Sequence, residues 1–165
     1  MARKSAAKTK GNTHEPTIEN RRARHDYQIL EKVEVGMKLT GTEIKSIRNG
    51  RVSLNEGFVR ASDSPPSLTL HNVHISEYPP AGQLQQHEPT RSRTLLAHNR
   101  EIRKLADQTR EKGVTIVPLK IYFVRGMAKL LIGLARGKGK ADRRQDIAKR
   151  DAERDMARAM SRARK

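Results

Sequence analysis

Apolar side chains able to form a core are confined to the middle of this 165-residue chain, which limits where a folded domain can lie. The last thirty residues, 136–165, contain twelve Lys or Arg, five Asp or Glu and no aromatic residue. Their apolar side chains are Ile147, Met156, Met160 and alanines, too few to bury a core. The excess of positive charge predicts that this segment becomes ordered against a polyanion.

The positive charge is unevenly distributed along the chain. The total is +17, from 35 Lys and Arg against 18 Asp and Glu, and residues 1–25, 26–135 and 136–165 carry +5, +5 and +7. The middle segment has the near-balanced charge and the size of one globular domain, and the whole charge favours a nucleic-acid partner. We expect three segments: a basic flexible arm over residues 1–19, a folded domain over residues 20–136 and a basic tail over residues 137–165.

Several classes of function are disfavoured by what the sequence lacks. There is no cysteine, and no apolar run approaches the length of a membrane span. The basic N-terminus is followed by no apolar stretch, so we expect no secretory signal, no membrane partner and a cytoplasmic location. His71 and His74 would point to opposite faces of a strand, and His25-Asp26 has no accompanying nucleophile. We therefore predict no metal site, no cofactor and no catalytic residue.

The start of the folded domain predicts a β-hairpin. Residues 27–33 and 37–48 are strand-like, and a gap of turn length, ending in Gly36, separates them. Ile44 and Ile47 stand three apart before Asn49-Gly50, so residues 43–49 form either a strand or a helical turn.

A second pair of strands follows. Residues 57–62 and 67–76 flank a turn at 63–66, and the apolar face of the second strand switches partway, which predicts a bulge or bend. The polar stretch 79–93 is expected to be an exposed loop.

The end of the domain predicts one helix and another hairpin. Leu95, Leu96, Ile102, Leu105 and Thr109 fit one helix face, with Asn99 as the N-cap and Gly113 just past the end. Two apolar runs then flank Arg125-Gly126, and Pro118 predicts an edge or bulge position. Six to seven short strands with one main helix predict a mainly β fold, a small closed barrel of the oligonucleotide-binding (OB) type.

The low aromatic content bears on how such a barrel would bind RNA. There are three Tyr, two Phe and no Trp, so a long platform for stacking bases is not available. Recognition of a folded RNA through its backbone, 2′-hydroxyls and shape is favoured instead.

Three stretches carry a family resemblance: NRRARHDYQILEKVEVGMKLTGTEIKSIRNGRVSL (20–54), HEPTRSRTLLAHNREIRKL (87–105) and EKGVTIVPLKIYFVRGMAKLLIGLARGKGKADRRQDIAKRD (111–151). They closely resemble the SmpB family of SsrA-binding proteins. The resemblance implies an OB-type barrel that binds the tRNA-like domain of transfer-messenger RNA (tmRNA) and accompanies it to stalled 70S ribosomes for trans-translation. It also implies elongation factor Tu and alanyl-tRNA synthetase as indirect partners, reached through the RNA.

The resemblance also implies which barrel residues bind RNA: Asn20, Arg22, Arg24, His25, Glu34, Lys45, Arg48, Arg91, Arg93, Leu96, Lys129, Gly137 and Lys138. A carboxylate such as Glu34 can accept hydrogen bonds from base amino groups or 2′-hydroxyls, where Lys and Arg can only donate. The residues themselves leave alternatives open. Glu34 could be a solvated turn residue, Leu96 a core residue and Lys129 a solvated lysine.

For the tail, the resemblance implies entry into the vacant mRNA channel of the small subunit, near the decoding region, and folding into a helix there. The ribosome-binding residues would be Asp142, Arg143, Arg144, Lys149, Arg150 and Asp151. The pair Asp146 and Arg150 supports a helix, but an isolated helix of this length is marginal, so we expect disorder until RNA surrounds it. The tail departs from the family pattern at Gly139 and at Ala141, which cannot stack on a base.

A ribosome-associated structural RNA-binding protein is the alternative function, because such proteins also combine small barrels with basic tails. Association with all ribosomes, as opposed to tmRNA and stalled complexes only, would distinguish the two.

Overall fold

The computed structural model describes residues 15–82, 84, 86–139, 152, 154–156 and 158–160. The elements are β1 (Ile18–Glu19), α1 (Arg21–Asp26), β2 (Tyr27–Met37), α2 (Gly41–Arg48), β3 (Val52–Ser53), β4 (Phe58–Asp63), β5 (Pro66–His71), β6 (His74–Ile75), the 3₁₀ turn η1 (Pro79–Ala81), β7 (Arg93–Leu96), α3 (Asn99–Gln108), β8 (Val114–Val124) and β9 (Met127–Gly137).

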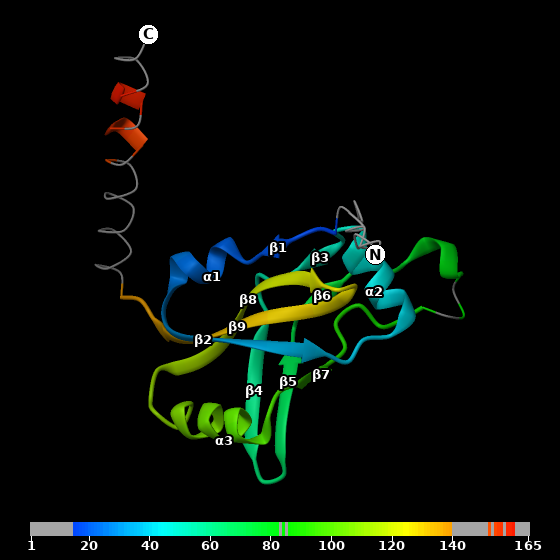
Figure 1. Cartoon of the computed structure of the whole chain (residues 1–165), viewed down its shortest axis with the longest axis horizontal. Helices are drawn as coiled ribbons and strands as arrows, with labels where there is room; N and C mark the ends of the chain where they lie inside the picture. Colours follow the sequence, from blue (N-terminus) through cyan, green and yellow to red (C-terminus); the bar gives the residue numbers. More distant parts are fainter. Residues whose placement is uncertain are drawn as a thin grey trace, which may run out of the picture.

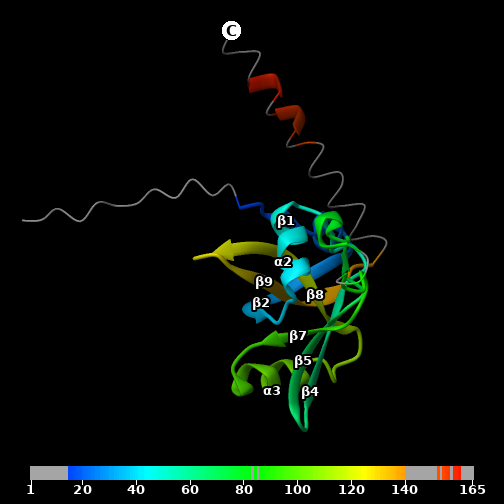
Figure 2. The same ribbon diagram turned by 90° about the vertical axis from the view of Figure 1, so that its right-hand side faces the viewer.

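Six strands close into a ring, which confirms the mainly β, OB-type barrel (Figure 1). The order around the ring is β8, β4, β5, β7, β2 and β9, and pairing of β9 with β8 closes it. Figure 2 shows β2, β8 and β9 on one side of the barrel and β4, β5 and β7 on the other. The ring is weakest between β4 and β8, which share only the pair Val59 and Ile116.

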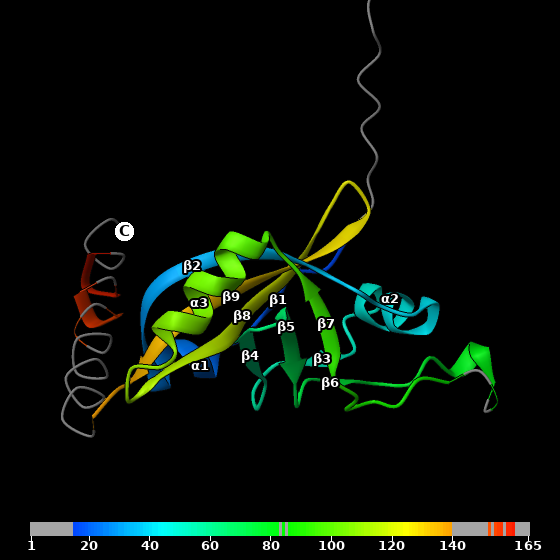
Figure 3. The same cartoon turned by 90° about the horizontal axis from the view of Figure 1, so that it is seen from below.

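The core follows from the alternation of apolar residues along the strands. Leu68, Leu70, Ile116 and Ile132 are fully buried inside the ring. Ile102 and Leu105 of α3 belong to the same core, and α3 lies near one end of β4 and β5 (Figures 1 and 3). Helix α3, the one main helix that the sequence predicts, therefore packs against the barrel core.

The hairpin predicted around residues 34–36 is wrong. β2 runs without a break from Tyr27 to Met37, pairing with β9 and then β7. Gly36 serves close packing here, because a Cβ on it would lie 3.2 Å from Leu96 Cβ. The open alternative at residues 43–49 resolves to helix α2, whose first turn is capped by Glu43.

The predicted start of the main helix also needs correction. Leu95 and Leu96 lie in strand β7, where Leu95 is buried and Leu96 is exposed. Helix α3 begins at Asn99, with His98 as the N-cap, and Glu101 accepts a hydrogen bond from the His98 N–H at 3.0 Å. Leu96 is therefore a surface residue, not a core residue.

Other local predictions are confirmed. β4 and β5 pair around the 63–66 turn, and the chain bends at Asn72, whose φ is +55°. β8 and β9 form the hairpin around Arg125 and Gly126, both with positive φ, and a register shift marks a bulge after Pro118. The loop before β7 is only partly exposed, because His87 is buried in it.

The ends of the domain differ from the expected boundaries. Ile18 and Glu19, placed in the N-terminal arm by the sequence, pair with Ile121 and Lys120 of β8. In the tail, the described residues 152, 154–156 and 158–160 are helical and exposed. The predicted ribosome contacts Asp142, Arg143, Arg144, Lys149, Arg150 and Asp151 lie outside the described residues. No helix in the described part of the chain is long and apolar enough to cross a membrane.

Candidate nucleic-acid interface

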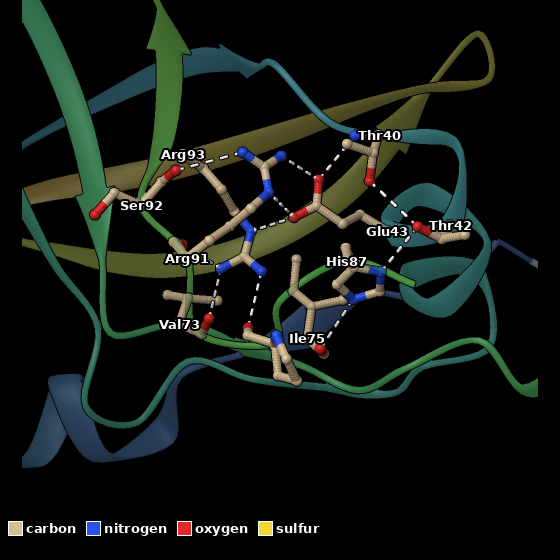
Figure 4. Close-up of polar contacts among 10 residues, drawn as sticks. Thr40, Thr42, Glu43, Val73, Ile75, His87, Arg91, Ser92 and Arg93 are labelled. Atoms are coloured by element: carbon tan, nitrogen blue, oxygen red, sulfur yellow. Dashed lines mark hydrogen bonds and ion pairs between the residues drawn. The ribbon is translucent and has the colours of Figure 1, made fainter. Parts of the chain in front are cut away.

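A buried carboxylate, Glu43, holds the surface elements together (Figure 4). It caps α2 by accepting from the Thr40 N–H at 2.7 Å, and it accepts from Arg91 Nε at 2.8 Å and Arg93 Nε at 2.7 Å. Burial opposes ionisation, but the hydrogen bonds from Arg91, Thr40 and Arg93 outweigh it and lower the pKa of Glu43 to about 2. Glu43 is therefore ionised at neutral pH and ties α2 to β7.

Arg93 belongs to this scaffold, by which we mean the hydrogen-bonded residues around Glu43, and its side chain has no exposed surface. Beyond Glu43, its guanidinium donates to the carbonyl oxygens of Val73 at 2.6 Å, Arg91 at 3.0 Å and Pro89 at 2.8 Å. All of these partners are internal, so Arg93 cannot contact RNA directly, which corrects that expectation. Arg91 is partly exposed, at 31% of its side chain.

His87 connects the loop before β7 to the same scaffold. Its Nε2 donates to the carbonyl oxygen of Ile75 at 3.1 Å, and its Nδ1 forms a hydrogen bond with the Thr42 hydroxyl at 2.9 Å. The His87 side chain thereby joins the loop before β7 to β6 and to the first turn of α2.

Asn20 is likewise a structural residue. It is buried, its amide donates to the carbonyl oxygens of Leu54 at 2.9 Å and Pro118 at 3.0 Å, and its Oδ1 caps α1 by accepting from the Ala23 N–H. Direct RNA contact by the Asn20 side chain is therefore excluded, and its role is to anchor α1 to the barrel.

Helix α1 presents the other candidates of the entry segment at the surface. The side chains of Arg22 and Arg24 are 62% and 53% exposed, and His25 lies 2.9 Å from Asp26. Gly137 pairs with Tyr27 at the end of β9, and Lys138 Nζ donates to the Arg24 carbonyl oxygen at 3.2 Å. We call this set, namely Arg22, Arg24, His25 and Lys138, the α1 patch.

A second cluster lies on the outer face of β2, β9 and β8. Glu34 projects from β2, and its carboxylate accepts a hydrogen bond from the Tyr122 hydroxyl and lies 3.5 Å from Lys129 Nζ. The hydrogen bond from Tyr122 lowers the pKa of Glu34 and raises the pKa of Tyr122 to about 12. Glu34 is therefore a strand residue and an ionised acceptor, not the turn residue expected from the sequence. We call Glu34, Tyr122 and Lys129 the Glu34 cluster.

The exposed cations of α2 are positioned by aromatic rings. Lys45 Nζ lies 5.2 Å from the centroid of the Tyr78 ring, and the Arg48 guanidinium lies 5.7 Å from that of Phe123. Arg48 also donates to the Gly126 carbonyl oxygen at 3.2 Å, which links α2 to the tip of the β8–β9 hairpin.

An apolar groove of about 390 Å³ joins the Glu34 cluster to α2. Leu96 and Met127, 57% and 56% exposed, line it together with Ile44 of α2, and Lys129 stands at its edge. The groove thus brings together Leu96 and Lys129, which are far apart in the sequence. Glu34 contacts Lys129 of this groove, and Arg48 contacts Gly126. Lys45 follows Ile44 in α2, so the surface in and around the groove combines apolar side chains with donors and one acceptor.

Two residues of this surface were missed by sequence reasoning. Neither Tyr122 nor Met127 is among the RNA-binding residues that the resemblance implies. Tyr122 pairs with Lys129 across β8 and β9, so the hairpin register could have placed it in the cluster. Among the described residues, no group of three His, Asp or Glu side chains is placed to hold a metal ion.

Comparison with known proteins identifies close relatives of this chain. The family model described as SmpB protein matches residues 17–162. An SsrA-binding protein of Levilactobacillus brevis is 49% identical over 97% of this chain and 98% of the relative, and one of Thermobifida fusca is 51% identical over 99% and 100%. A solved chain described as "tmRNA-SmpB: a journey to the center of the bacterial ribosome" is 50% identical, with a TM-score of 0.64 over 76% of this chain and 86% of the other.

Proposed function

This chain belongs to the SmpB family, and we propose from that premise that it binds the tRNA-like domain of tmRNA and delivers it to stalled ribosomes for trans-translation. The observation that carries the proposal is the apolar groove between the Glu34 cluster and α2. Its mixture of cations, one ionised carboxylate and exposed apolar side chains suits a folded RNA, which offers riboses and bases as well as phosphates, better than a ligand that offers negative charge alone.

Each part of this surface has a distinct role in the proposal. Lys45, Arg48 and Lys129 neutralise phosphates, which supplies affinity but little discrimination. Glu34 accepts from a 2′-hydroxyl or a base amino group, and its lowered pKa keeps it ionised for that purpose. Leu96 and Met127 offer apolar contact to an unstacked base or a ribose.

The tail has a separate role in the proposal. It enters the vacant mRNA channel of the small subunit, where phosphates neutralise its cations and its helix is completed. The residues described between 152 and 160 are helical and exposed, which supports a helical tail with its side chains free to meet RNA. Elongation factor Tu and alanyl-tRNA synthetase are reached through the bound RNA, and the function places the protein in the cytoplasm.

The binding mode is tested by the salt dependence of affinity for the tRNA-like domain. Lys129→Ala should reduce the slope of log K against log salt by about 0.7–0.9, the contribution of one phosphate contact. Glu34→Ala should weaken binding without this reduction, because an acceptor releases no counterion. Lys112→Ala, an exposed lysine in the turn before β8, serves as the control and should change neither quantity. Equal slope changes for Lys129→Ala and Glu34→Ala would contradict the role given to Glu34.

A further inference from the structure

The Glu34 cluster lies in two neighbouring rows of side chains that run across the outer face of the barrel. The first row, on β7, β2, β9 and β8 in turn, consists of Leu96, Gly36, Lys129 and Tyr122. The second row, on β2, β9 and β8, consists of Glu34, Leu131 and Lys120. The alternate residues Val35, Leu130 and Ile121 are buried in the core, so both rows face outward.

Tyr122 reaches Glu34 across an intervening strand. β9 separates β8 from β2, so the backbones of the two residues lie two strand spacings apart, about 9–10 Å. The Tyr122 hydroxyl donates a hydrogen bond to Glu34 Oε2, so the tyrosine side chain extends over β9 from the first row towards the second. Lys120 Nζ lies 5.3 Å from the centroid of the Tyr122 ring and helps to hold the ring in place.

The two partners of the Glu34 carboxylate differ in how firmly they are held. Lys129 Nζ lies 3.5 Å from Glu34 Oε1, but its ammonium is carried on a flexible stem and is attracted to phosphate. The Tyr122 hydroxyl is neutral and sits on a rigid ring, so a phosphate does not draw it away. When Lys129 turns to a phosphate, Tyr122 therefore keeps the carboxylate in place.

We propose that Tyr122 is a positioning residue for the Glu34 carboxylate. It fixes one carboxylate oxygen, and it leaves the other oxygen to accept from the RNA once Lys129 has moved to a phosphate. Tyr122 gives its one hydroxyl proton to Glu34, so it acts through Glu34 and not by donating to the RNA. This inference rests on the proposed function, because it takes Glu34 as the acceptor for the RNA.

The hydroxyl can be removed without changing the charges around Glu34. Charged side chains on four strands face Glu34 or lie in its row, namely Lys32 on β2, Lys129 on β9, Lys120 on β8 and Glu19 on β1. Tyr122→Phe leaves all of them, and the ring itself, in place. The variant therefore isolates the hydrogen bond to Glu34.

The first measurement follows Glu34 in the full chain without RNA. The hydrogen bond from Tyr122 is the largest cause of the lowered pKa of Glu34, and Lys129 adds to it. In Tyr122→Phe the pKa of Glu34 should rise towards the ordinary value of 4.5, because the donor that favours the charged form is gone. The chemical shift of the Glu34 carboxyl carbon, followed by NMR from pH 6 to 3, reports this change. A pKa of Glu34 that is the same in both proteins would overturn the positioning role.

The second measurement is a double-mutant cycle on the affinity of the full chain for the tRNA-like domain. Tyr122→Phe should weaken binding about two- to tenfold, the range for one hydrogen bond, and by no more than Glu34→Ala does. In the Glu34→Ala background, Tyr122→Phe should have no further effect, because the hydroxyl has no carboxylate left to hold. Tyr27→Phe removes a hydroxyl at the start of β2 and serves as the control, with unchanged affinity.

The outcomes of the cycle separate the two claims. If Glu34→Ala binds as tightly as the native chain, the role of Glu34 in the proposed function fails, and the positioning role fails with it. If Glu34→Ala weakens binding and Tyr122→Phe does not, only the positioning role is overturned. Equal weakening by Tyr122→Phe with and without the Glu34 carboxylate would also overturn it, because the hydroxyl would then contact the RNA itself.

Discussion

Glu43 is the residue on which the placement of the candidate interface depends most. Its carboxylate accepts hydrogen bonds from Thr40, Arg91 and Arg93. The Arg93 guanidinium also donates to the Pro89 carbonyl oxygen in the loop before β7. Lys45 and Arg48 are on the same helix as Glu43, and Leu96 is on the same strand as Arg93. Loss of this carboxylate would therefore move the two sides of the apolar groove relative to each other.

We predict that Glu43→Gln lowers the free energy of unfolding by about 3–5 kcal/mol at neutral pH, because it leaves the Arg93 charge buried and uncompensated. Urea denaturation of the two proteins measures this difference. Glu31→Gln removes a partly exposed carboxylate beside Lys104 and should cost no more than about 1 kcal/mol. A Glu43→Gln variant as stable as Glu31→Gln would show that the Glu43 carboxylate does not stabilise the fold.

The same carboxylate predicts how stability depends on pH. Its pKa falls from an ordinary value of 4.5 to about 2 on folding, so its contribution is complete above pH 4.5 and is lost as the pH falls towards 2. The contribution is on the order of 3 kcal/mol. Unfolding followed from pH 5 to 2 should show a loss of stability in native protein that is much smaller in Glu43→Gln, and parallel curves would contradict the assignment.

At the residue scale, the sequence did not predict the environment of several candidate residues. Leu96 is exposed and Lys129 is partly exposed at the groove, so both stay candidates for RNA contact. Arg93 and Asn20 were expected at the RNA and are buried. Their partners lie 50 residues away at Glu43 and 34 and 98 residues away at Leu54 and Pro118, and such pairings are not visible in local sequence.

Among the elements, two local patterns misled the sequence prediction and one was interpreted correctly. Gly36 suggested a turn, but it lies within β2 because Leu96 of β7 packs against it. Leu95 and Leu96 fitted a helical face, because two adjacent apolar residues before a helix satisfy both periodicities. The β8–β9 hairpin was predictable because Arg125-Gly126 interrupts two long apolar runs, and both residues adopt the positive φ that the turn needs.

Gly57 predicts a test of how β4 is joined to the β8 bulge. A Cβ at this position would lie 2.5 Å from Val73 Cγ2 and 2.9 Å from Pro118 Cγ, two groups with little freedom to move. Gly57→Ala should therefore lower the free energy of unfolding by about 1–3 kcal/mol. Gly41→Ala, at the open start of α2, has no atom within 4 Å of the added Cβ and should stabilise by about 0.4–1 kcal/mol. Thermal melting of both variants measures the difference, and equal effects would refute the close packing at Gly57.

The helix of the tail is the element on which tagging should depend. Ala152 and Ala159 are helical and exposed, so glycine at both positions removes helix stability, about 1 kcal/mol each, without disturbing the barrel. We predict that Ala152→Gly with Ala159→Gly impairs tagging of peptides on stalled ribosomes and leaves tmRNA binding unchanged. Glutamine at the same two positions preserves helix propensity and should preserve tagging. Full tagging by the double glycine variant would mean that the tail acts as an extended charged strand.

For the whole molecule, we propose that the work is divided between a barrel and a tail. The barrel presents the Glu34 cluster on β2, β8 and β9. The sequence predicts this division from the distribution of core-forming side chains and of charge. It could not predict which surface each strand would present, because that depends on the order of strands around the ring.

The most direct test of the account is the affinity of a chain ending after Gly139 for the tRNA-like domain of tmRNA. This end point keeps β9 and the hydrogen bond from the Lys138 N–H to the Asp26 carbonyl oxygen, so the barrel stays intact. If the barrel holds the RNA, the shortened chain should bind with an affinity within about tenfold of the full chain, or 1.4 kcal/mol, while tagging on stalled ribosomes is lost. Loss of RNA binding together with the tail would contradict the account.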